Sequence, residues 1–463
     1  MKKMGMYLTA IIFLALAACG GGGDAFVWDE TRDNPFYGES ISIAVLYSTP
    51  ELRQFARIFT SQNPGSNIEL VPLAGPGDGL LGMNADFDLL RDRLAVQIMA
   101  GQGPTVMDAR FVNFRNRAFF ACWLPLIDAH PRFNDDEWFM HVFCALTENG
   151  ELLVFPEFID FHYVAGNIHL PELQRDMAGM ETVTVSELVQ LYNRHGEADS
   201  GYSLLRSDNV IWSNVWFSDE FVDFGTGFVD FMNPGFVGLL EDAFRIMKPV
   251  PDSVWAEIAR TGSSLGFYLK TNYFMFDIAV PLNPLPHGVV DGNLGFAEPM
   301  LLVNDEGEMI VSTWPAAQGR WVLSTGATST QQAMALEFIR LTQDTSIHEV
   351  LNVHRNSWMH WQVSMPLSRA RFDYHVERRL NLFLQNEGGE FPRIHTDREF
   401  IATETARLYA AMNRPMAAMP SVPAGIYGFF GELLERMHLG LVSPEDAAMQ
   451  LYNRTVIEML EGN

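Results

Sequence analysis

The sequence predicts an α/β protein built around a parallel sheet, and two observations support this prediction. Apolar segments rich in β-branched residues alternate with segments whose apolar residues recur at helical spacing. Between residues 41 and 107 the order is strand, helix, strand, helix, strand, which favours parallel strands joined by right-handed crossovers. The length of 463 residues further indicates two or three units of domain size.

The predicted elements begin with an apolar strand at residues 41–47. The helix after it has one apolar face at i, i+3, i+4 and i+7, formed by Leu52, Phe55, Ala56 and Phe59. Residues 68–71 form a second strand, and a second helix carries an apolar stripe of Phe87, Leu90, Leu94 and Ile98. The turn at residues 101–104 ends that helix, and Val106 starts a third strand.

The carboxyl ends of these strands are the expected place for a ligand. Ligands of open α/β sheets bind in the crevice outside the carboxyl ends of the strands. We therefore expect ligand contacts within residues 47–51 and 108–111, with Tyr47, Asp108 and Phe111 as the candidate side chains.

The N-terminus has the layout of a secretory signal. Two lysines precede an apolar run from Tyr7 to Ala18, and Cys19 follows directly. The run of about twelve residues is shorter than the roughly 20 that a membrane-spanning helix needs. We therefore predict a signal peptide at residues 1–18 and a flexible tether at residues 19–39, which opens with four glycines.

The segment from Leu16 to Cys19 resembles the bacterial lipobox. This resemblance implies cleavage before Cys19, a diacylglyceryl group on its sulfur, and a protein anchored on the outer face of the cell membrane. The alternative is an ordinary secretion signal that is followed by cysteine through chance.

Composition and charge exclude several classes of function. Hydrophobic residues make up 48% and charged residues 19% of the chain, as in folded globular proteins. The net charge of −26, which becomes −28 without Lys2 and Lys3, repels phosphate backbones. We therefore expect no nucleic-acid partner, and no adhesion to anionic lipid through protein side chains.

The chain lacks the common motifs for nucleotides and metals. The glycine-rich loop at residues 75–79 has no lysine after it, so it is not a Walker phosphate loop. There is no HExxH and no CxxC, and the 12 histidines are scattered, so we predict neither a metal site nor a cofactor. Cys122 and Cys144 either pair in a disulfide or remain as two thiols, and the sequence leaves both possibilities open.

Six segments resemble, in the right order, the extracellular solute-binding proteins of bacterial carbohydrate ABC importers, of the maltose-binding type. The first is "QIMAGQGPTVM" at residues 97–107, and the others lie at residues 124–128, 149–156, 221–240, 335–339 and 443–448. The last of these is also a good helix start, with Ser443 as the cap and Pro444 in the first turn. Thr105 departs from the family signature, which has an aspartate there; a threonine can still cap local backbone.

The resemblance implies a type II periplasmic-binding-protein fold, with two hinge-connected α/β lobes and a ligand cleft. The chain would cross between lobes near Pro156, Pro299 and Pro366. We therefore predict that lobe 1 consists of residues 40–156 and 299–364, and that lobe 2 consists of residues 157–298 and 365–463.

The implied ligand is a sugar or oligosaccharide, which requires flat aromatic faces for its rings and polar groups for its hydroxyls. The candidate contacts are Tyr47, Asp108, Phe111, Asp160, Tyr163, Trp212, Trp216, Trp314, Tyr427 and Phe430. Glu157 is a further candidate carboxylate. For each aromatic the alternative is core packing, and for each carboxylate it is a solvated face or a hinge salt bridge.

The implied function is that of a receptor, not an enzyme: a monomer that delivers a carbohydrate to an ABC permease. Residues 262–266 match GxSxG, but a helix is predicted before this motif and a strand after it, the reverse of a nucleophile elbow. The alternatives are a receptor for a peptide or another small organic solute, a surface lipoprotein without a transport role, and a glycoside hydrolase whose paired carboxylates meet only in three dimensions.

Overall fold

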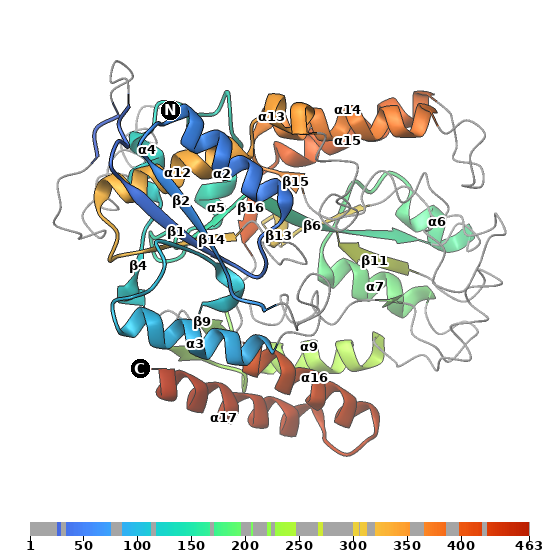
Figure 1. Cartoon of the computed structure of the whole chain (residues 1–463). Helices are drawn as coiled ribbons and strands as arrows, with labels where there is room; N and C mark the ends of the chain where they lie inside the picture. Colours follow the sequence, from blue (N-terminus) through green and yellow to red (C-terminus); the bar gives the residue numbers. More distant parts are fainter. Residues whose placement is uncertain are drawn as a thin grey trace, which may run out of the picture. The chain divides into compact units, whose positions relative to one another are not determined.

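The computed structural model forms two compact units, and each unit has its own sheet (Figure 1). Unit 1 contains residues 1–159 and 313–375, and unit 2 contains residues 160–312 and 376–463. The structure describes residues 26–28, 34–75, 86–112, 117–166, 171–195, 205–206, 220–223, 227–246, 267–271, 300–304, 306–312, 320–351, 365–385, 398–418 and 424–462.

Unit 1 is built on a six-stranded sheet whose first three strands are parallel, as predicted. The strand order is β2-β1-β3-β14-β4, and β5 also pairs with β14. β14 runs antiparallel to its neighbours β3, β4 and β5. The strands are β1 (Ser40–Val45), β2 (Asn67–Pro72), β3 (Val106–Asp108), β4 (Phe120–Ala121), β5 (Val154–Pro156) and β14 (Arg320–Ser324).

The helices of unit 1 follow from local sequence signals. The first, α2 (Pro50–Gln62), begins at Thr49, whose hydroxyl accepts the N–H of Leu52, and it buries the predicted apolar face. α12 (Ser329–Thr342) begins with a capping box between Thr328 and Gln331. The other helices are α3 (Phe87–Met99), α4 (Leu124–Ala129), α5 (Met140–Ala145) and α13 (Thr345–Leu351).

A tight turn joins α5 to β5. Asn149 and Gly150 both have positive φ, 51° and 79°, and Glu148 pairs with Glu151 across them. This is the pattern of a type I′ turn, which favours Asn-Gly because both central residues need the left-handed region.

Unit 2 is organised around β6 (Phe158–Gly166), the longest described strand, which begins two residues before the unit boundary. The order of its sheet is β16-β13-β6-β11-β8, β12 pairs with both β6 and β7, and β15 pairs with the start of β6. The strands are β7 (Thr182–Val183), β8 (Leu205–Arg206), β11 (Phe267–Thr271), β12 (Met300–Leu302), β13 (Met309–Ser312), β15 (Met365–Pro366) and β16 (Met416–Ala418). A separate hairpin joins β9 (Val222–Asp223) to β10 (Phe228–Val229).

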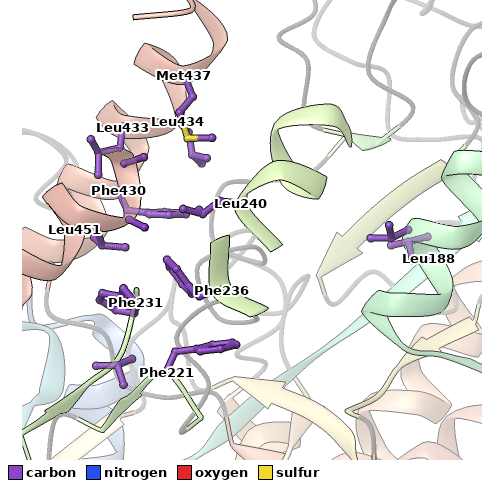
Figure 2. Packing of buried hydrophobic residues seen from close by; sticks show 14 of the residues in the cluster. Leu188, Phe221, Phe231, Phe236, Leu240, Phe430, Leu433, Leu434, Met437 and Leu451 are labelled. Carbon is purple, nitrogen blue, oxygen red and sulfur yellow. The ribbon is translucent and has the colours of Figure 1, made fainter. Parts of the chain in front are cut away.

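The core of unit 2 lies among its helices (Figure 2). The ring of Phe236 contacts the rings of both Phe221 and Phe231, and side chains of the last two helices complete the cluster. α17 begins as predicted, with the Ser443 hydroxyl accepting the N–H of Asp446. The helices are α6 (Pro171–Met177), α7 (Val185–His195), α9 (Pro234–Ile246), α14 (Arg369–Gln385, which starts in unit 1), α15 (Arg398–Met412), α16 (Ala424–His438) and α17 (Pro444–Gly462).

The boundaries between the units differ from the predicted crossings. The segment from residue 300 to residue 312 belongs to unit 2 rather than to the first lobe, because β12 and β13 both pair with β6. Residues 365–375 belong to unit 1, because β15 pairs with Ile159 and Arg371 contacts Glu157. Each of the three prolines precedes the point at which the chain changes unit, because strand pairing decides to which unit a segment belongs.

Candidate ligand-binding site

The carboxyl ends of β1 and β3 lie next to each other in unit 1. The two strands are parallel and Ala44 is opposite Met107, so Tyr47 and Asp108 follow at the same edge of the sheet. Asp108 ends β3 and is only 1% exposed. Its carboxylate accepts the backbone N–H of Arg110 at 3.1 Å, which shapes a short 3-10 turn at Ala109–Phe111. The sequence thus placed Tyr47 and Asp108 correctly at strand ends.

Arg110 completes this group and was not singled out from the sequence. Its Nε lies 3.0 and 3.1 Å from the two carboxylate oxygens of Asp108, and its Nη2 lies 2.5 Å from Oδ2. The guanidinium is held in a bidentate geometry and remains 16% exposed. A cation two residues after a carboxylate that ends a strand was the signal in the sequence that could have identified it.

Tyr47 provides a neutral hydroxyl at the same edge. Its side chain is half-buried and packs against the apolar cluster that contains Ala44 and Met107. Burial raises the pKa of the phenol; Arg110 acts in the opposite direction, and Glu51 and Asp108 raise the pKa further. At neutral pH the hydroxyl therefore keeps its proton and can both donate and accept a hydrogen bond.

Two predicted contact residues lie instead in apolar cores. Phe111 is buried in the unit 1 cluster with Val112 and Leu153, and Phe430 is buried in the unit 2 cluster with Leu433 and Phe236. Both rings pack in an apolar cluster of their own unit, which is the core-packing alternative stated above, and the guanidinium of Arg110 also lies over the ring of Phe111 at 5.5 Å from its centroid. Phe111 lies in the 3-10 turn after β3, and Phe430 lies in α16. Because both rings are buried, neither has a free face on which a sugar could stack.

Glu157 was a candidate carboxylate for the ligand, and the structure places it in a buried network. It is 6% exposed, and its Oε1 accepts hydrogen bonds from Trp321 Nε1 at 2.6 Å and from Thr342 Oγ1 at 3.1 Å. Arg371 Nη1 lies 3.8 Å from its Oε2 and donates to the carbonyl of Thr342 at 3.0 Å. The acceptors of Glu157 are thus engaged inside the protein, as in the salt-bridge alternative.

Burial dominates the ionisation of this pair. Loss of water raises the pKa of Glu157, against the effects of Arg371, Trp321, Thr342 and Gln343. The same loss of water lowers the pKa of Arg371 to about 10, against the effect of Glu157. Both shifts have the sign expected when desolvation costs more than the pairing returns.

The remaining candidates are placed only in part. Asp160 and Tyr163 lie in β6, where Asp160 is opposite Ser312 and Tyr163 is opposite Lys270 and Leu301. Tyr427 lies in the first turn of α16. Trp212, Trp216, Trp314 and Cys19 lie outside the described residues, as does the GxSxG segment.

Thr105, which replaces the family aspartate, bonds to a distant strand. Its Oγ1 accepts the N–H of Ser42 at 3.2 Å, and Ser42 Oγ accepts the N–H of Thr105 at the same distance. The hydroxyl therefore joins the segment before β3 to β1, 63 residues away, in place of the local capping that we expected.

The structure also bears on metal binding, on the two cysteines and on membrane-spanning helices. Within the described ranges, no group of three or more His, Cys, Asp or Glu side chains is placed to hold a metal ion. Cys122 is half-buried, Cys144 is exposed, and both are free thiols. No helix in the described part of the chain is long and apolar enough to cross a membrane.

Comparisons with solved structures show the same fold in bacterial binding proteins. The sugar-binding protein MalE from Xanthomonas citri matches with a TM-score of 0.55 and 15% identity, over 91% of this chain and 98% of that chain. A periplasmic oligogalacturonide binding protein from Yersinia enterocolitica matches with a TM-score of 0.56 and 11% identity, over 91% and 99% of the two chains. An uncharacterized protein from Listeria monocytogenes gives 0.53, with 14% identity over 91% and 99%.

Sequence comparison alone finds no relative. No family model matches the chain, and no curated protein matches it. The similarity to the solved structures therefore concerns the fold: the chain has the α/β fold of type II periplasmic binding proteins, as the sequence predicts.

Proposed function

We propose that this protein is the substrate-binding receptor of an ABC importer, which captures a sugar or oligosaccharide outside the membrane and delivers it to a permease. The observation that supports this most is the extent of the fold similarity. The sugar-binding protein from Xanthomonas citri and the oligogalacturonide binding protein from Yersinia enterocolitica are each covered almost completely by this chain. Each match covers 91% of this chain, so the likeness extends to both units.

The proposed site in unit 1 consists of Tyr47, Asp108 and Arg110. Its groups are a neutral phenol, a carboxylate and a guanidinium at one edge of the sheet. Hydroxyls of a sugar can accept from the guanidinium, which the buried carboxylate of Asp108 holds in place, and the phenol can both donate and accept. From the rest of the chain we propose Asp160, Tyr163, Trp212, Trp216, Trp314 and Tyr427 as further contacts.

We propose a neutral sugar as the ligand. Arg110 is already paired with Asp108 through both carboxylate oxygens, so its charge is compensated within the protein. The chain as a whole carries a net charge of −26, which disfavours an acidic ligand at long range. A uronate would add a negative charge at this site. Among Tyr47, Asp108 and Arg110 the only cation is Arg110, which already pairs with Asp108.

The remaining parts of the proposal concern location and partners. Cleavage before Cys19 and acylation of its sulfur would hold a monomeric receptor on the outer face of the cell membrane, and two acyl chains suffice for stable anchoring. The receptor performs no chemical step, and affinity arises from hydrogen bonds and stacking in a site that excludes water.

A thermal-shift screen of the chain from Gly20 onward tests this function. We expect neutral mono- or oligosaccharides of one family to raise the melting temperature, because a ligand that binds only the folded state stabilises it. Uronates, amino acids and short peptides serve as comparison ligands. A rise with peptides alone would overturn the carbohydrate assignment, and a rise with uronates alone would overturn the preference for a neutral sugar.

A further inference from the structure

An aromatic cluster in unit 1 holds the segment that directly follows the proposed tether. The ring of Phe26 stacks on Phe36 at 5.9 Å between centroids, and it meets Trp28 edge to face at 5.0 Å. Trp28 in turn lies 4.0 Å from the ring of His130. Phe36 continues the cluster inward to Phe59, which is buried in α2. Residues 26–28 are therefore packed on the body of unit 1.

The side chains of residues 26–28 alternate between the aromatic cluster and solvent. Phe26 and Trp28 contact the aromatic cluster, whereas Val27 between them is 78% exposed. This is the period of two of an extended chain, in which successive side chains point in opposite directions. Tyr37, the neighbour of Phe36, is likewise 77% exposed. The outward side chains beside the cluster are thus an aliphatic residue and a tyrosine.

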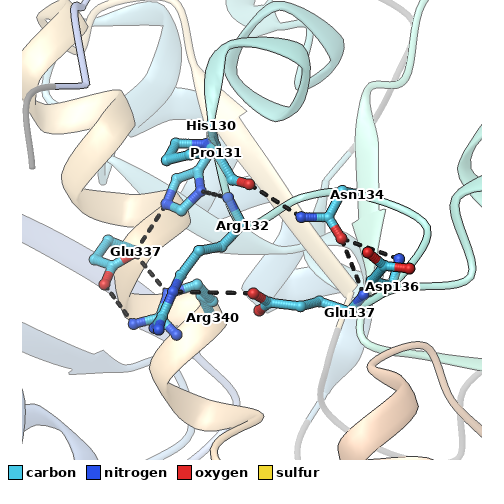
Figure 3. Close-up of polar contacts among 8 residues, drawn as sticks. All are labelled: His130, Pro131, Arg132, Asn134, Asp136, Glu137, Glu337 and Arg340. Carbon is cyan, nitrogen blue, oxygen red and sulfur yellow. Dashed lines mark hydrogen bonds and ion pairs between the residues drawn. The ribbon is translucent and has the colours of Figure 1, made fainter.

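The ring of Trp28 packs against His130. Figure 3 shows the contacts of His130 with Arg132 and Glu337. The Nδ1 of His130 accepts the backbone N–H of Arg132 at 3.0 Å, and its Nε2 lies 3.1 Å from Oε2 of Glu337. Glu337 is held in turn by Arg340, at 2.8 and 2.6 Å. The imidazole ring is therefore oriented from both nitrogens, so Trp28 packs on a surface that is already ordered.

The packing shortens the free part of the tether. Seven peptide steps separate Cys19 from Phe26, which span at most about 25 Å when fully extended. Without this contact, the next described anchor is Asn34, whose side-chain amide donates to the carbonyl of Pro64. The fifteen steps from Cys19 to Asn34 allow about 50 Å. The contact thus halves the distance that unit 1 can move from an anchor on Cys19.

We propose that residues 26–28 form a clip that holds one face of unit 1 against the lipid surface. This inference rests on the proposed lipid anchor at Cys19. Val27 inside the clip and Tyr37 beside it are both exposed and meet the membrane interface, where tyrosine is favoured because its ring is apolar and its hydroxyl is polar. Since the chain is strongly acidic, side-chain charge does not attract it to anionic lipid, and the short tether supplies the proximity instead.

Fluorescence energy transfer between a dye on unit 1 and dyes on the lipid headgroups measures the distance of unit 1 from the bilayer surface. The lipidated full-length protein is placed in nanodiscs of phosphatidylcholine, with a donor dye on the exposed thiol of Cys144 and acceptor dyes on the lipid headgroups. We expect Phe26→Ala/Trp28→Ala to lower the transfer efficiency, since the permitted tether length doubles and energy transfer falls steeply with distance. Val96→Ser is the matched control, because Val96 is an exposed valine of α3 in the same unit, outside the clip and the aromatic cluster, and it should leave the transfer as in the wild type.

A tether insertion tests the same proposal without altering the cluster. Seven Gly and Ser residues added after Gly23 should lower the transfer as the double variant does, with an unchanged melting temperature. Equal transfer in the wild type, the double variant and the insertion would overturn the clip. Failure of the anchor is separately visible, because the wild-type protein would not be recovered in the membrane fraction. Failure of sugar binding is visible in the thermal-shift screen, which uses the soluble chain.

Discussion

The indole Nε1 of Trp321 donates a 2.6 Å hydrogen bond to Oε1 of Glu157, although 164 residues separate them in the chain. Trp321 lies opposite Asp108 in the sheet, and its carbonyl accepts the indole N–H of Trp123 at 3.0 Å. Arg371 contacts the other oxygen of Glu157. A buried polar network thus supports the strand that lies beside the proposed ligand site.

Removal of one charge from this network should destabilise unit 1. Glu157→Leu leaves the buried guanidinium of Arg371 without its carboxylate, and we expect the free energy of unfolding to fall by about 3 to 5 kcal/mol. Glu157→Leu/Arg371→Met should recover a large part of this loss, because neither charge then remains buried. Urea unfolding at pH 7 measures both. Equal destabilisation in the single and double variants would show that the ion pair is not the cause.

The pair of Asp108 and Arg110 should decide ligand affinity. Arg110→Ala removes a donor for hydroxyls, and Asp108→Asn removes the charge that holds this donor in place. We expect each change to raise the dissociation constant for the sugar found in the screen by about tenfold, or roughly 1.4 kcal/mol. Arg117→Ala is the matched control, since this arginine forms an exposed ion pair with Glu148 in the same unit. Titration calorimetry measures the affinities. Wild-type affinity in both site variants would remove the pair from the site.

Glu337 should make stability depend on acidity. Arg340 and His130 overcome the effect of burial and lower the pKa of this carboxyl to about 2, from 4.5. Between these two values the unfolded chain binds more protons than the folded one, so stability falls as the pH falls through this range. The shift corresponds to roughly 3 kcal/mol that is fully present above about pH 5.

Glu337→Gln tests this dependence. The variant should be less stable than the wild type at pH 7, and the difference should shrink as the pH approaches 2. Denaturant unfolding across this range gives the two curves. Parallel curves from pH 7 to pH 2 would contradict the assignment to Glu337.

The turn between α5 and β5 should be sensitive at Gly150. Its φ of 79° is costly for a residue with a Cβ, so Gly150→Ala should lower the free energy of unfolding by about 1 to 2 kcal/mol, although no atom lies within 4 Å of the added carbon. Gly238→Ala is the opposite control, because Gly238 lies inside α9 with open space around it. That change should stabilise the protein by about 0.5 to 1 kcal/mol. The same sign for both variants would argue against the positive-φ explanation.

The two remaining cysteines should behave as thiols. We expect reductant to leave the melting temperature unchanged, and a thiol reagent to modify Cys144 before the half-buried Cys122. Burial, together with Asp128 and Asp135, raises the pKa of the Cys144 thiol, so its modification should accelerate at alkaline pH. An oxidised protein without reactive thiols would show instead that the two cysteines pair.

The sequence by itself determined the features that depend on neighbouring residues. Helical spacing identified the buried face of α2, the Ser-Pro start located α17, and the alternation of elements predicted the parallel strands of unit 1. These signals are local, because a helix or a strand repeats its pattern within a few residues. The strand ends also led to Asp108, since parallel strands place their carboxyl ends together.

Only the tertiary structure decided which of the candidate side chains are available to a ligand. Asp108 ends β3 and Glu157 directly follows β5, so they look equivalent in the sequence, and both are buried. Asp108 pairs with the partly exposed Arg110 two residues away, whereas Glu157 is enclosed by Trp321, Thr342 and Arg371, which come from distant parts of the chain. Phe430 was likewise a candidate contact in the sequence, and the structure packs it in the core of unit 2. Burial and pairing depend on contacts between residues far apart in the chain, and the pattern of neighbouring residues does not predict these contacts.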